Sequence, residues 1–430
     1  MTGTRRLVVT CAAAISVLAP AAAGAAPLVR ARPSLQPAFQ TGAPDYAVRC
    51  TAGTPVKLSI DAPKGTTVAV DGGTPRGGRF DTSVALAPGR AALLRVRRSA
   101  GARNYHVRCL PADFPRWKAT RYGKPEAAFY VLTPNHNSFD PGYTTVVDSR
   151  GVPLWWMRSS TSTFDGHLLP NGHLAWNHWV GNSPESGPFE ERALDGSFVR
   201  NWDTVGHATN QHDLRFLPNG NALIISYPPR DHVDLSRWGG PSDATVLDGE
   251  IQEVDPSGQR VWRWNTRDHI ALRESDHWGR SLIENPRVRT KDNRPVYDIV
   301  HVNSVALDGD LVVFSARYED AVYEVDRTTH DVVWKLGGRH TDQSLRLVND
   351  ELPAKQEFGG NHDARVPTGH GSGVVTLYDN GTLMNRPPRA LAYRIAHAAV
   401  PGDPNEARGG CRAGIALPQP FTASAPARSR

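Results

Sequence analysis

The chain has 430 residues, enough for roughly two to three domains, and its 39% hydrophobic and 21% charged residues are typical of a globular protein. The formal net charge is +6, but no block of basic residues is present that would follow a phosphate backbone, so nucleic-acid binding is not expected. The 39 glycines and 34 prolines indicate many turns and few long helices.

The first 26 residues have the composition of a secretory signal peptide. Arg5 and Arg6 precede an apolar run from Leu7 to Leu18, and small residues follow up to Ala26. The run is too short to anchor a mature protein in a bilayer, and no later stretch is long and apolar enough to span one. We therefore expect an exported protein without a membrane span, either secreted or periplasmic.

The next part of the chain is predicted to be a linker over residues 27–44 and a small β-sandwich over residues 45–112. The linker is rich in proline and alanine, whereas the second segment contains short alternating runs separated by turns. Cys50 and Cys109 stand in similar contexts, YAVRC and YHVRC, at the two ends of the sandwich. In an oxidising compartment this arrangement favours a disulfide, and it leaves Cys411 without an evident partner.

From about residue 116 two sequence patterns alternate. In one of them an aspartate precedes a tryptophan by seven or eight residues, with turn residues between, at Asp148–Trp155, Asp195–Trp202, Asp255–Trp262 and Asp326–Trp334. The other pattern is a histidine followed by an apolar run and a turn, often Leu-Pro-Asn-Gly. Two hairpins per unit make a four-stranded sheet, and units that recur every ~40–50 residues are typical of a β-propeller. The tryptophans are interpreted as packing residues.

Five such units are present, at residues 127–160, 161–206, 207–270, 298–340 and 358–396. Residues 228–250 are predicted to be an insertion in the third unit, and residues 271–297 a connection to the fourth. Residues 397–430 lack the Asp–Trp hairpin and are predicted to be an irregular tail. A ring needs its last blade to close. The expected fold is therefore all-β: a sandwich, then a propeller over residues 116–396 of the six-bladed type, with its last blade degenerate or missing.

Three histidines from different units are predicted to meet in the channel. His212, His301 and His362 each begin an innermost strand, and innermost strands line the channel of a propeller. Arg317 ends the strand next to that of His301, and Asn303 shares the face of His301. Neutral and cationic donors with no carboxylate on the same face indicate an anion site. Such a site can also stabilise charge on a group that is being transferred.

Other polar residues of the repeat are interpreted as structural. Asp213 and Asp363 directly follow two of the histidines, so strand alternation points them the other way, and we expect them to form bonds between blades. His167 and His173 flank a copy of the Leu-Pro-Asn-Gly turn without further supporting residues. Three tryptophans in loops are candidates for an aromatic substrate pocket, namely Trp176, Trp179 and Trp238.

The runs QHDLRFLPNGNALIIS, DIVHVNSVALDGDLVVFSAR and NHDARVPTGHGSGVVTLYDNG resemble the bacterial arylsulfate sulfotransferase (arylsulfotransferase, ASST) family, over about residues 120–395. The resemblance implies a six-bladed propeller that moves a sulfuryl group from an aryl sulfate donor to a phenolic acceptor, through a transiently sulfated histidine and without a nucleotide donor. By its motif His362 matches the nucleophile. His212, His301 and Arg317 match the residues that hold the sulfate, and Asn303 matches a neighbour in the donor site.

No cofactor and no metal are expected, and a homodimer is possible. The chain departs from the family after Ile395, because the donor-site residues of a last blade have no recognisable equivalent in the tail.

Two alternatives remain open. Three histidines with an open fourth position are a known zinc arrangement, so a metal-dependent hydrolase is one of them, although Arg317 nearby would repel the cation. The other is a secreted propeller that binds an anionic sugar or a protein and performs no chemistry, because a fold by itself does not fix a function.

Overall fold

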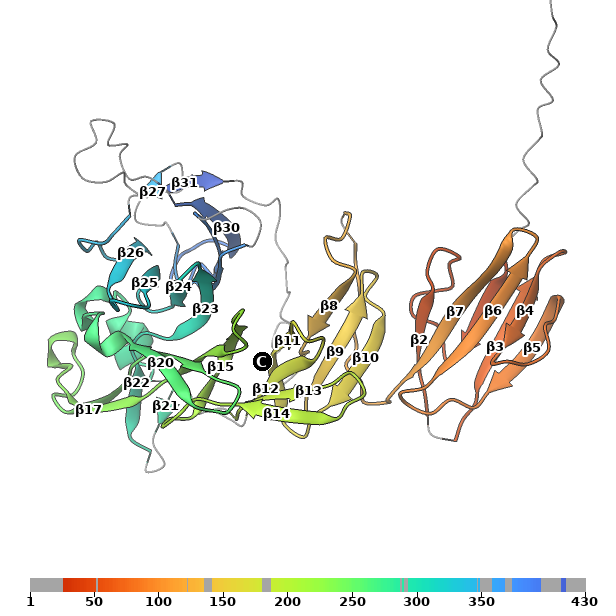
Figure 1. Cartoon of the computed structure of the whole chain (residues 1–430), viewed down its shortest axis with the longest axis horizontal. Helices are drawn as coiled ribbons and strands as arrows, with labels where there is room; N and C mark the ends of the chain where they lie inside the picture. Colours follow the sequence, from red (N-terminus) through yellow and green to blue (C-terminus); the bar gives the residue numbers. More distant parts are fainter. Residues whose placement is uncertain are drawn as a thin grey trace, which may run out of the picture. The chain divides into compact units, whose positions relative to one another are not determined.

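The computed structural model describes residues 26–51, 53–121, 123–134, 141–179, 187–286, 288–289, 293–345, 347–348, 358–367, 373–395 and 411–414 (Figure 1). The expected signal peptide, except for its last residue, lies outside these ranges. The chain divides into two compact units, Met1–Ala128 with Val147–Trp155, and Phe129–Val146 with Trp156–Arg430. The regular structure is almost entirely strand, which confirms the predicted all-β class.

The first unit contains two sheets, with strand orders β1-β3-β5 and β2-β7-β6-β4. Their strands are β1 (Leu28–Arg32), β2 (Asp45–Arg49), β3 (Val56–Ala62), β4 (Thr67–Val70), β5 (Gly78–Val84), β6 (Ala91–Arg98) and β7 (Gly101–Leu110). Apolar side chains alternate with exposed ones, as in β3, where Val56, Leu58 and Ile60 are buried and Lys57 and Ser59 are exposed. Buried residues of both sheets form one hydrophobic cluster, so the two sheets pack face to face.

The predicted linker is partly wrong, because residues 28–32 form β1. This strand pairs antiparallel with β3, from Leu28 opposite Asp61 to Arg32 opposite Lys57. Val29 and Ala31 are buried in the core of the sandwich. Only two inward positions carry this alternation, and the surrounding prolines and alanines obscure it in the sequence.

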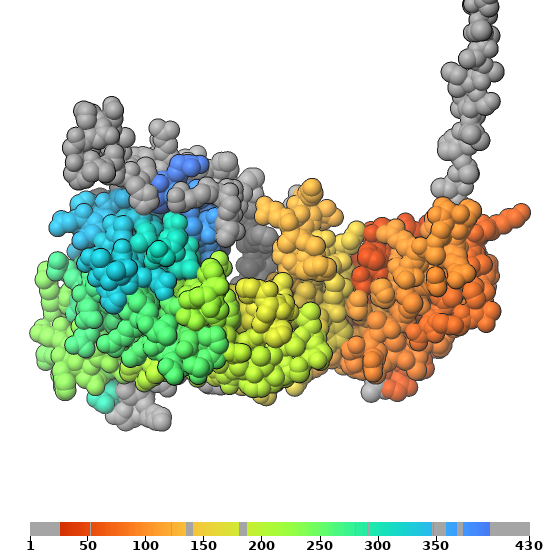
Figure 2. Space-filling view, in the orientation of Figure 1, coloured from red at the N-terminus to blue at the C-terminus, as the bar shows by residue number. Residues whose placement is uncertain are grey.

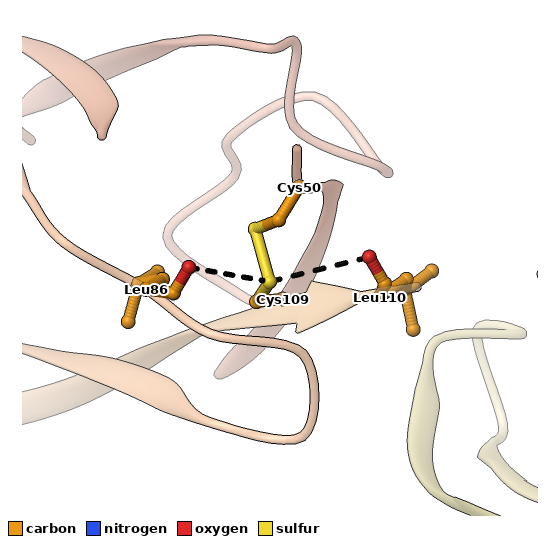
Figure 3. The surroundings of a disulfide bond; sticks show 4 residues. All are labelled: Cys50, Leu86, Cys109 and Leu110. Carbon is orange, nitrogen blue, oxygen red and sulfur yellow. Dashed lines mark hydrogen bonds between the residues drawn. A yellow bond between two sulfur atoms is a disulfide. The ribbon is translucent and has the colours of Figure 1, made fainter. Parts of the chain in front are cut away.

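The predicted disulfide between Cys50 and Cys109 is confirmed (Figure 3). Their Cα atoms lie 5.5 Å apart, and both cysteines are buried. Cys50 directly follows β2 and Cys109 lies in β7, two strands that pair in parallel. In the sequence, β2 is the first strand of this sheet and β7 is the last. The bond therefore links two neighbouring strands between which the chain forms the rest of the sheet.

Five of the remaining sheets are built mainly from the five sequence units (Figure 1). Their strand orders are β10-β9-β8, β11-β12-β13-β14, β15-β16-β19-β20, β23-β24-β25-β26 and β27-β31-β30-β29-β28. The strands that belong to the predicted hairpins are β8 (Phe129–Leu132), β9 (Tyr143–Asp148), β10 (Pro153–Arg158), β11 (Ser162–Leu168), β12 (Leu174–Trp179), β13 (Phe189–Arg192), β14 (Phe198–Trp202), β15 (Thr209–Phe216), β16 (Ala222–Ser226), β19 (Glu250–Val254), β20 (Arg260–Asn265), β23 (Val302–Asp308), β24 (Leu311–Ala316), β25 (Ala321–Asp326), β26 (Val332–Gly337), β28 (His362–Arg365), β29 (Val374–Asp379) and β30 (Arg389–Arg394).

The aspartates of the repeat fix the turns of the outer hairpins. The carboxylate of Asp148 accepts hydrogen bonds from the backbone nitrogens of Arg150 and Val152, and Asp255 does the same for Ser257 and Gln259. An aspartate can bond to its own backbone two residues on, which favours a turn at that point. This is the physical reason for the aspartate in the repeated pattern.

The predicted insertion, residues 228–250, and the predicted connection, residues 271–297, together form a further sheet. It contains β17 (Pro229–Val233), β18 (Ala244–Leu247), β21 (Val288–Arg289) and β22 (Pro295–Asp298), in the order β17-β18-β22-β21. β18 and β22 pair in parallel across a long sequence separation, so no turn between them marks the pairing. Four short helical elements lie near it, η1 (Ser236–Trp238), η2 (Thr266–Asp268), η3 (Leu272–Glu274) and the π-helical η4 (Trp278–Ile283).

The predicted irregular tail also contributes to a sheet. β31 (Cys411–Gly414) pairs antiparallel with β30 and parallel with β27 (Leu347–Val348). The last sheet is therefore completed by a strand that lacks the sequence pattern of the repeat. Ring closure and the number of blades stay predictions.

The first strands of successive sheets lie side by side, with β11 next to β15, β15 next to β23, and β23 next to β28. In the space-filling view the surface of β11–β14, in yellow and yellow-green, continues into that of the green strands that follow (Figure 2). Each of these four first strands has a shift in its pairing register. Such bulges re-aim side chains and are frequent next to active sites. Among the described helices, none has the length and apolar character needed to cross a bilayer.

Removal of the disulfide is expected to destabilise the first unit. The bond joins cysteines separated by 59 residues, and a loop of that size contributes about 2–4 kcal/mol by restricting the unfolded chain. The Cys50→Ser, Cys109→Ser double variant should therefore begin to unfold at a lower guanidinium concentration, as followed by circular dichroism of the full chain. A reductant should shift the wild type but not the variant, and an unchanged first transition would contradict the prediction.

Candidate functional site

A cavity of about 660 Å³ in the second unit contains all four residues that the sequence assigns to catalysis. His212 lies in β15, His301 directly precedes β23, and His362 begins β28. Arg317 follows the last residue of β24. Because these strands belong to three different sheets, the site exists only when the sheets are assembled.

The three imidazole rings lie against one another. The ring centroids of His212 and His301 are 4.7 Å apart, those of His301 and His362 5.8 Å, and those of His212 and His362 6.0 Å. Three protonated imidazoles at these distances would repel one another strongly. The arrangement therefore disfavours protonation of all three rings at the same time.

His212 is held by an amide from its own strand. Its Nδ1 lies 2.6 Å from Oδ1 of Asn210, which also accepts the backbone N–H of His212 at 3.1 Å. Burial, followed by the neighbouring His301, His362 and Arg317, lowers the pKa of His212 well below its ordinary value. Because the amide oxygen only accepts, the proton belongs on Nδ1, which leaves Nε2 with its free electron pair.

His301 has a carboxylate partner that the sequence analysis did not foresee. Its Nδ1 contacts Oδ2 of Asp298, and Asp298 lines the same cavity. The expectation that no carboxylate shares the face of the histidines is therefore wrong. Asp298 ends β22, in the additional sheet, so its approach depends on a pairing that the sequence does not reveal. His301 has a φ of 58°, a left-handed conformation that is strained for a residue other than glycine and is frequent at functional sites.

His362 is held by a backbone carbonyl. Its Nδ1 lies 2.9 Å from the oxygen of Gly360, and the amide nitrogen of Asn380 donates to the same oxygen. The amide nitrogen of Asn380 also lies 2.8 Å from Nδ1. A proton on Nδ1, bonded to the carbonyl oxygen of Gly360, would leave Nε2 free to act as a nucleophile. Burial, aided by the charges of His301 and Arg317, lowers the pKa of His362 to about 4.

Arg317 supplies the positive charge of the cavity. Its backbone nitrogen donates to the carbonyl oxygen of His301 at 3.2 Å, and its guanidinium carbon lies 4.7 Å from the ring centroid of Tyr318. Within the described parts of the chain the guanidinium makes no ion pair. A guanidinium fork that is oriented but not neutralised is suited to an oxyanion with two acceptor oxygens.

Asn303 does not line the cavity. Its side chain is buried, its amide nitrogen donates to the carbonyl oxygen of Asn361 at 2.9 Å, and its amide oxygen accepts the backbone N–H of Asp363 at 3.3 Å. It thereby fastens β23 to the start of β28. A contact between Asn303 and a substrate stays a prediction.

The interpretation of Asp213 as a structural residue is confirmed. It is fully buried, and Oδ2 accepts the backbone N–H of Val305, in the neighbouring sheet, at 2.7 Å. The same oxygen contacts Arg365. Asp363 pairs with Arg365 as well, although its side chain is largely exposed.

Aromatic side chains form part of the cavity wall. Trp179 lines it, as do Tyr227, Tyr297 and Tyr318. Of the three tryptophans proposed for a substrate pocket, Trp179 alone is in this wall. Trp176 is buried in β12, and Trp238 stacks on Trp278 with 4.6 Å between ring centroids. Asn210 and Asn380 were also missed, because an asparagine two residues before or eighteen after a histidine forms no recognised motif.

The three histidines are also able to hold a metal ion. One ring nitrogen from each of His212, His301 and His362 lies within 4.8 Å of the others. Imidazole nitrogens are good zinc ligands. Arg317 adds a fixed positive charge to the same cavity, which opposes a cation and favours an anion.

Comparison with known proteins gives one family. The model of the family described as Arylsulfotransferase (ASST) matches residues 117–399. No curated protein matches the chain. The solved structures similar to it include Myxococcus xanthus glutaminyl cyclase, with 12% identity, a TM-score of 0.27, and coverage of 55% of this chain and 76% of that one.

Two further solved structures are similar over more of the chain. Kuenenia stuttgartiensis hydrazine synthase has 12% identity and a TM-score of 0.36, with coverage of 83% of this chain and 97% of that one. The AfRom2 CNH domain has 10% identity and a TM-score of 0.33, with coverage of 80% and 92%. TM-scores this low do not identify a shared fold.

His362 is expected to stay neutral under mildly acidic conditions. Its pKa of about 4 lies below that of an ordinary imidazole, about 6.5, so the ring remains unprotonated at pH 5.5. Acylation by diethyl pyrocarbonate, which requires a neutral imidazole, should therefore proceed at His362 with nearly the same rate at pH 5.5 and pH 7.5. Peptide mapping by mass spectrometry would measure this rate, with a histidine-containing peptide as the reference. A rate at His362 that halves near pH 6.5, as in the peptide, would contradict the prediction.

Proposed function

The chain belongs to the arylsulfotransferase family, and from this premise we propose that it moves a sulfuryl group from an aryl sulfate ester to a phenolic acceptor, with His362 as the group that carries the sulfuryl in between. The reaction would need no nucleotide sulfate donor. The observation that carries the proposal is an un-neutralised guanidinium, that of Arg317, in the same cavity as His362, whose lowered pKa keeps the ring neutral.

The donor fits the charge of the cavity. An aryl sulfate ester carries one negative charge, spread over three oxygens that are not part of the ester bond. Arg317 would bind two of these oxygens. The aromatic wall formed by Trp179, Tyr227 and Tyr318 would pack against the aryl ring.

In the first half-reaction Nε2 of His362 attacks the sulfur atom. The new S–N bond forms as the bond between sulfur and the aryl oxygen breaks, and the leaving phenolate takes a proton from a neighbouring histidine. In the second half-reaction the acceptor phenol gives its proton back to that histidine, and its oxygen attacks sulfur. The S–N bond then breaks and His362 is regenerated.

His301 is the better candidate for the proton transfers. Its Nδ1 contacts Asp298, whose carboxylate fixes the ring and shares the charge of an imidazolium when one forms. His212 instead has a neutral amide, Asn210, as its partner. Burial and the nearby imidazoles and Arg317 lower the pKa of His212. It is therefore suited to stay neutral beside the sulfate.

We also propose that the protein is exported and that its repeated sheets form a propeller. The disulfide between Cys50 and Cys109 and the signal-like first 26 residues support export. The five repeat sheets with adjacent first strands support a propeller, because side-by-side inner strands surround the axis of that fold.

Loss of the proposed nucleophile should abolish transfer. With p-nitrophenyl sulfate as donor and phenol as acceptor, the wild type should release nitrophenol in an acceptor-dependent way, and His362→Ala should lower the rate about a thousandfold or more. Without acceptor, brief exposure of the wild type to donor should leave one sulfuryl group on the peptide that contains His362. His232→Ala, at an exposed histidine of β17, is the matched control and should retain full activity.

Other outcomes would support other functions. Release that persists in His362→Ala, or that needs no acceptor and stops with a chelator, would indicate a metal-dependent hydrolase built on the three histidines. No release by a well-folded wild type would indicate a protein that binds an anion without transferring it.

Arg317 is expected to act on the transition state. Arg317→Ala should lower kcat/KM for aryl sulfate by about a hundredfold to a thousandfold, because preorganised charge at a reacting anion is worth that much. Arg317→Lys keeps the charge but loses the planar fork, so it should recover only part of the rate. Steady-state kinetics of the three proteins would measure this series. Equal activity of all three would show that Arg317 does not contact the sulfate.

A further inference from the structure

A second group of charged side chains lies outside the cavity, on β11 and β15. It contains Asp165 and His167 from β11 and Asp213 from β15. One carboxylate oxygen of each aspartate and one ring nitrogen of the histidine lie within 4.8 Å of one another. The proposed sulfuryl transfer uses none of these residues.

The separations within this group are close to those of ligands that share a metal ion. Nε2 of His167 lies 2.6 Å from Oδ2 of Asp165 and 3.9 Å from Oδ1 of Asp213. Ligand atoms bound tetrahedrally at about 2.0–2.1 Å are about 3.3 Å apart. The two measured distances bracket that value, so small side-chain rotations are enough to bring the atoms to a common ion.

One carboxylate oxygen of Asp213, Oδ1, has no hydrogen-bond partner in the described structure. Asp213 is fully buried, and its Oδ2 is used by the backbone N–H of Val305 and by Arg365. Its Oδ1 is buried too, and in the described structure it accepts no hydrogen bond. Nε2 of His167 lies 3.9 Å from it. A buried carboxylate oxygen without a partner costs free energy, and native structures rarely retain one without a reason.

The charges of the surroundings also favour a cation. Three carboxylates meet here, those of Asp165, Asp213 and Asp363, and Arg365 is the one arginine that contacts any of them in the part of the chain that the structure describes. Its guanidinium is used by Oδ2 of Asp213 and by Asp363. Asp165 and Oδ1 of Asp213 both lie near Nε2 of His167.

The local backbone brings Asp165 and His167 together. The register of β11 with β12 shifts between Phe164 and His167. Gly166 lies between Asp165 and His167 in the sequence. A Cβ atom at this position would come within 3.0 Å of Val131, in β8, and within 2.9 Å of Thr133, directly after β8. A glycine at this position therefore lets the chain carry two polar side chains toward β15 while it packs against β8 on the other side.

The repeat places Asp165 and Asp213 at equivalent positions. Each lies four residues before the leucine of a Leu-Pro-Asn-Gly turn, Leu169 and Leu217 respectively. Phe164 therefore stands where the next sheet has His212, which explains why this sheet sends no histidine into the cavity.

We propose that Asp165, His167 and Asp213 bind one divalent transition-metal ion, of which Zn²⁺ is the representative. A set of one imidazole nitrogen and two carboxylate oxygens suits Zn²⁺ and similar ions, whereas Ca²⁺ takes six to eight oxygen ligands and Mg²⁺ prefers oxygen as well. The bound ion would join β11 to β15, and through Asp213 it would also support β23. Its role is structural and does not depend on the proposed sulfuryl transfer.

The experiment compares Zn²⁺ binding by the full-length protein and two histidine variants. Each protein is treated with a chelator, dialysed and titrated with Zn²⁺ by isothermal calorimetry, and the melting temperature is measured with and without Zn²⁺. His167→Gln should bind one ion fewer than the wild type, or bind it at least tenfold more weakly, and should lose the rise in melting temperature. His212→Gln, which alters the three histidines of the cavity instead, should keep this site and the rise.

A second variant distinguishes loss of the metal ligand from a folding defect. Asp165→Asn retains the shape of the side chain and removes one charge, so it should also weaken Zn²⁺ binding at least tenfold while its circular dichroism stays that of the wild type. The proposal is overturned if the wild type binds no Zn²⁺, if both His167→Gln and Asp165→Asn bind it as the wild type does, or if His212→Gln abolishes all binding. Sulfuryl transfer by the chelator-treated wild type is a separate measurement, so failure of either proposal leaves the other unaffected.

Discussion

The candidate site depends on hydrogen bonds that run from side chains of one first strand to the backbone of the next. Among the described strands, β15, β23 and β28 belong to separate sheets, so no main-chain ladder holds them in register with one another. Their positions are set instead by Asp213, which accepts the backbone N–H of Val305, by Asn303, which donates to the carbonyl oxygen of Asn361, and by Ser304, whose Oγ accepts the backbone N–H of Ala364. These groups are buried, and loss of one partner typically costs about 1–3 kcal/mol. The geometry of three imidazoles that meet in one cavity is thus controlled by residues that do not face it.

The three histidines of the cavity differ in the group that their Nδ1 atom contacts. His212 bonds to an amide, His301 to a carboxylate and His362 to a backbone carbonyl. A carboxylate supports a ring that must take and give a proton, whereas a carbonyl fixes the proton on one nitrogen and frees the other. Burial and the charge of Arg317 keep His362 and His212 neutral. The division of labour in the proposed reaction follows from these partners more than from the position of each histidine in its strand.

The same strands present different chemistry on their two faces. His212 and Asp213 are neighbours in β15, and the first faces the cavity while the second faces Asp165, His167 and Arg365. The register shifts in β11, β15 and β28 include or adjoin these residues, and the shift in β23 lies at Asn303. A bulge interrupts the hydrogen bonds between two strands locally and changes the direction of the side chains at that point. Strand alternation in β15 thus separates the proposed anion site, on the side of His212, from the proposed metal site, on the side of Asp213.

The sequence by itself determined the all-β class, the five repeat units, the disulfide between Cys50 and Cys109 and the histidines and arginine of the cavity. These features are encoded locally, by the alternation of each strand, by aspartates that bond within their own turns and by repetition of one motif. Only the tertiary structure decided that residues 28–32 belong to the sandwich, that β18 and β22 pair in parallel, that Cys411–Gly414 completes the last sheet, that Asp298 reaches His301 and that Asn303 lies behind the cavity wall. All of these except the contact between Asp298 and His301, which are three residues apart, depend on which distant segments come together. The free energy that selects such contacts comes from burial and pairing across the assembled sheets, and no single stretch of sequence carries it.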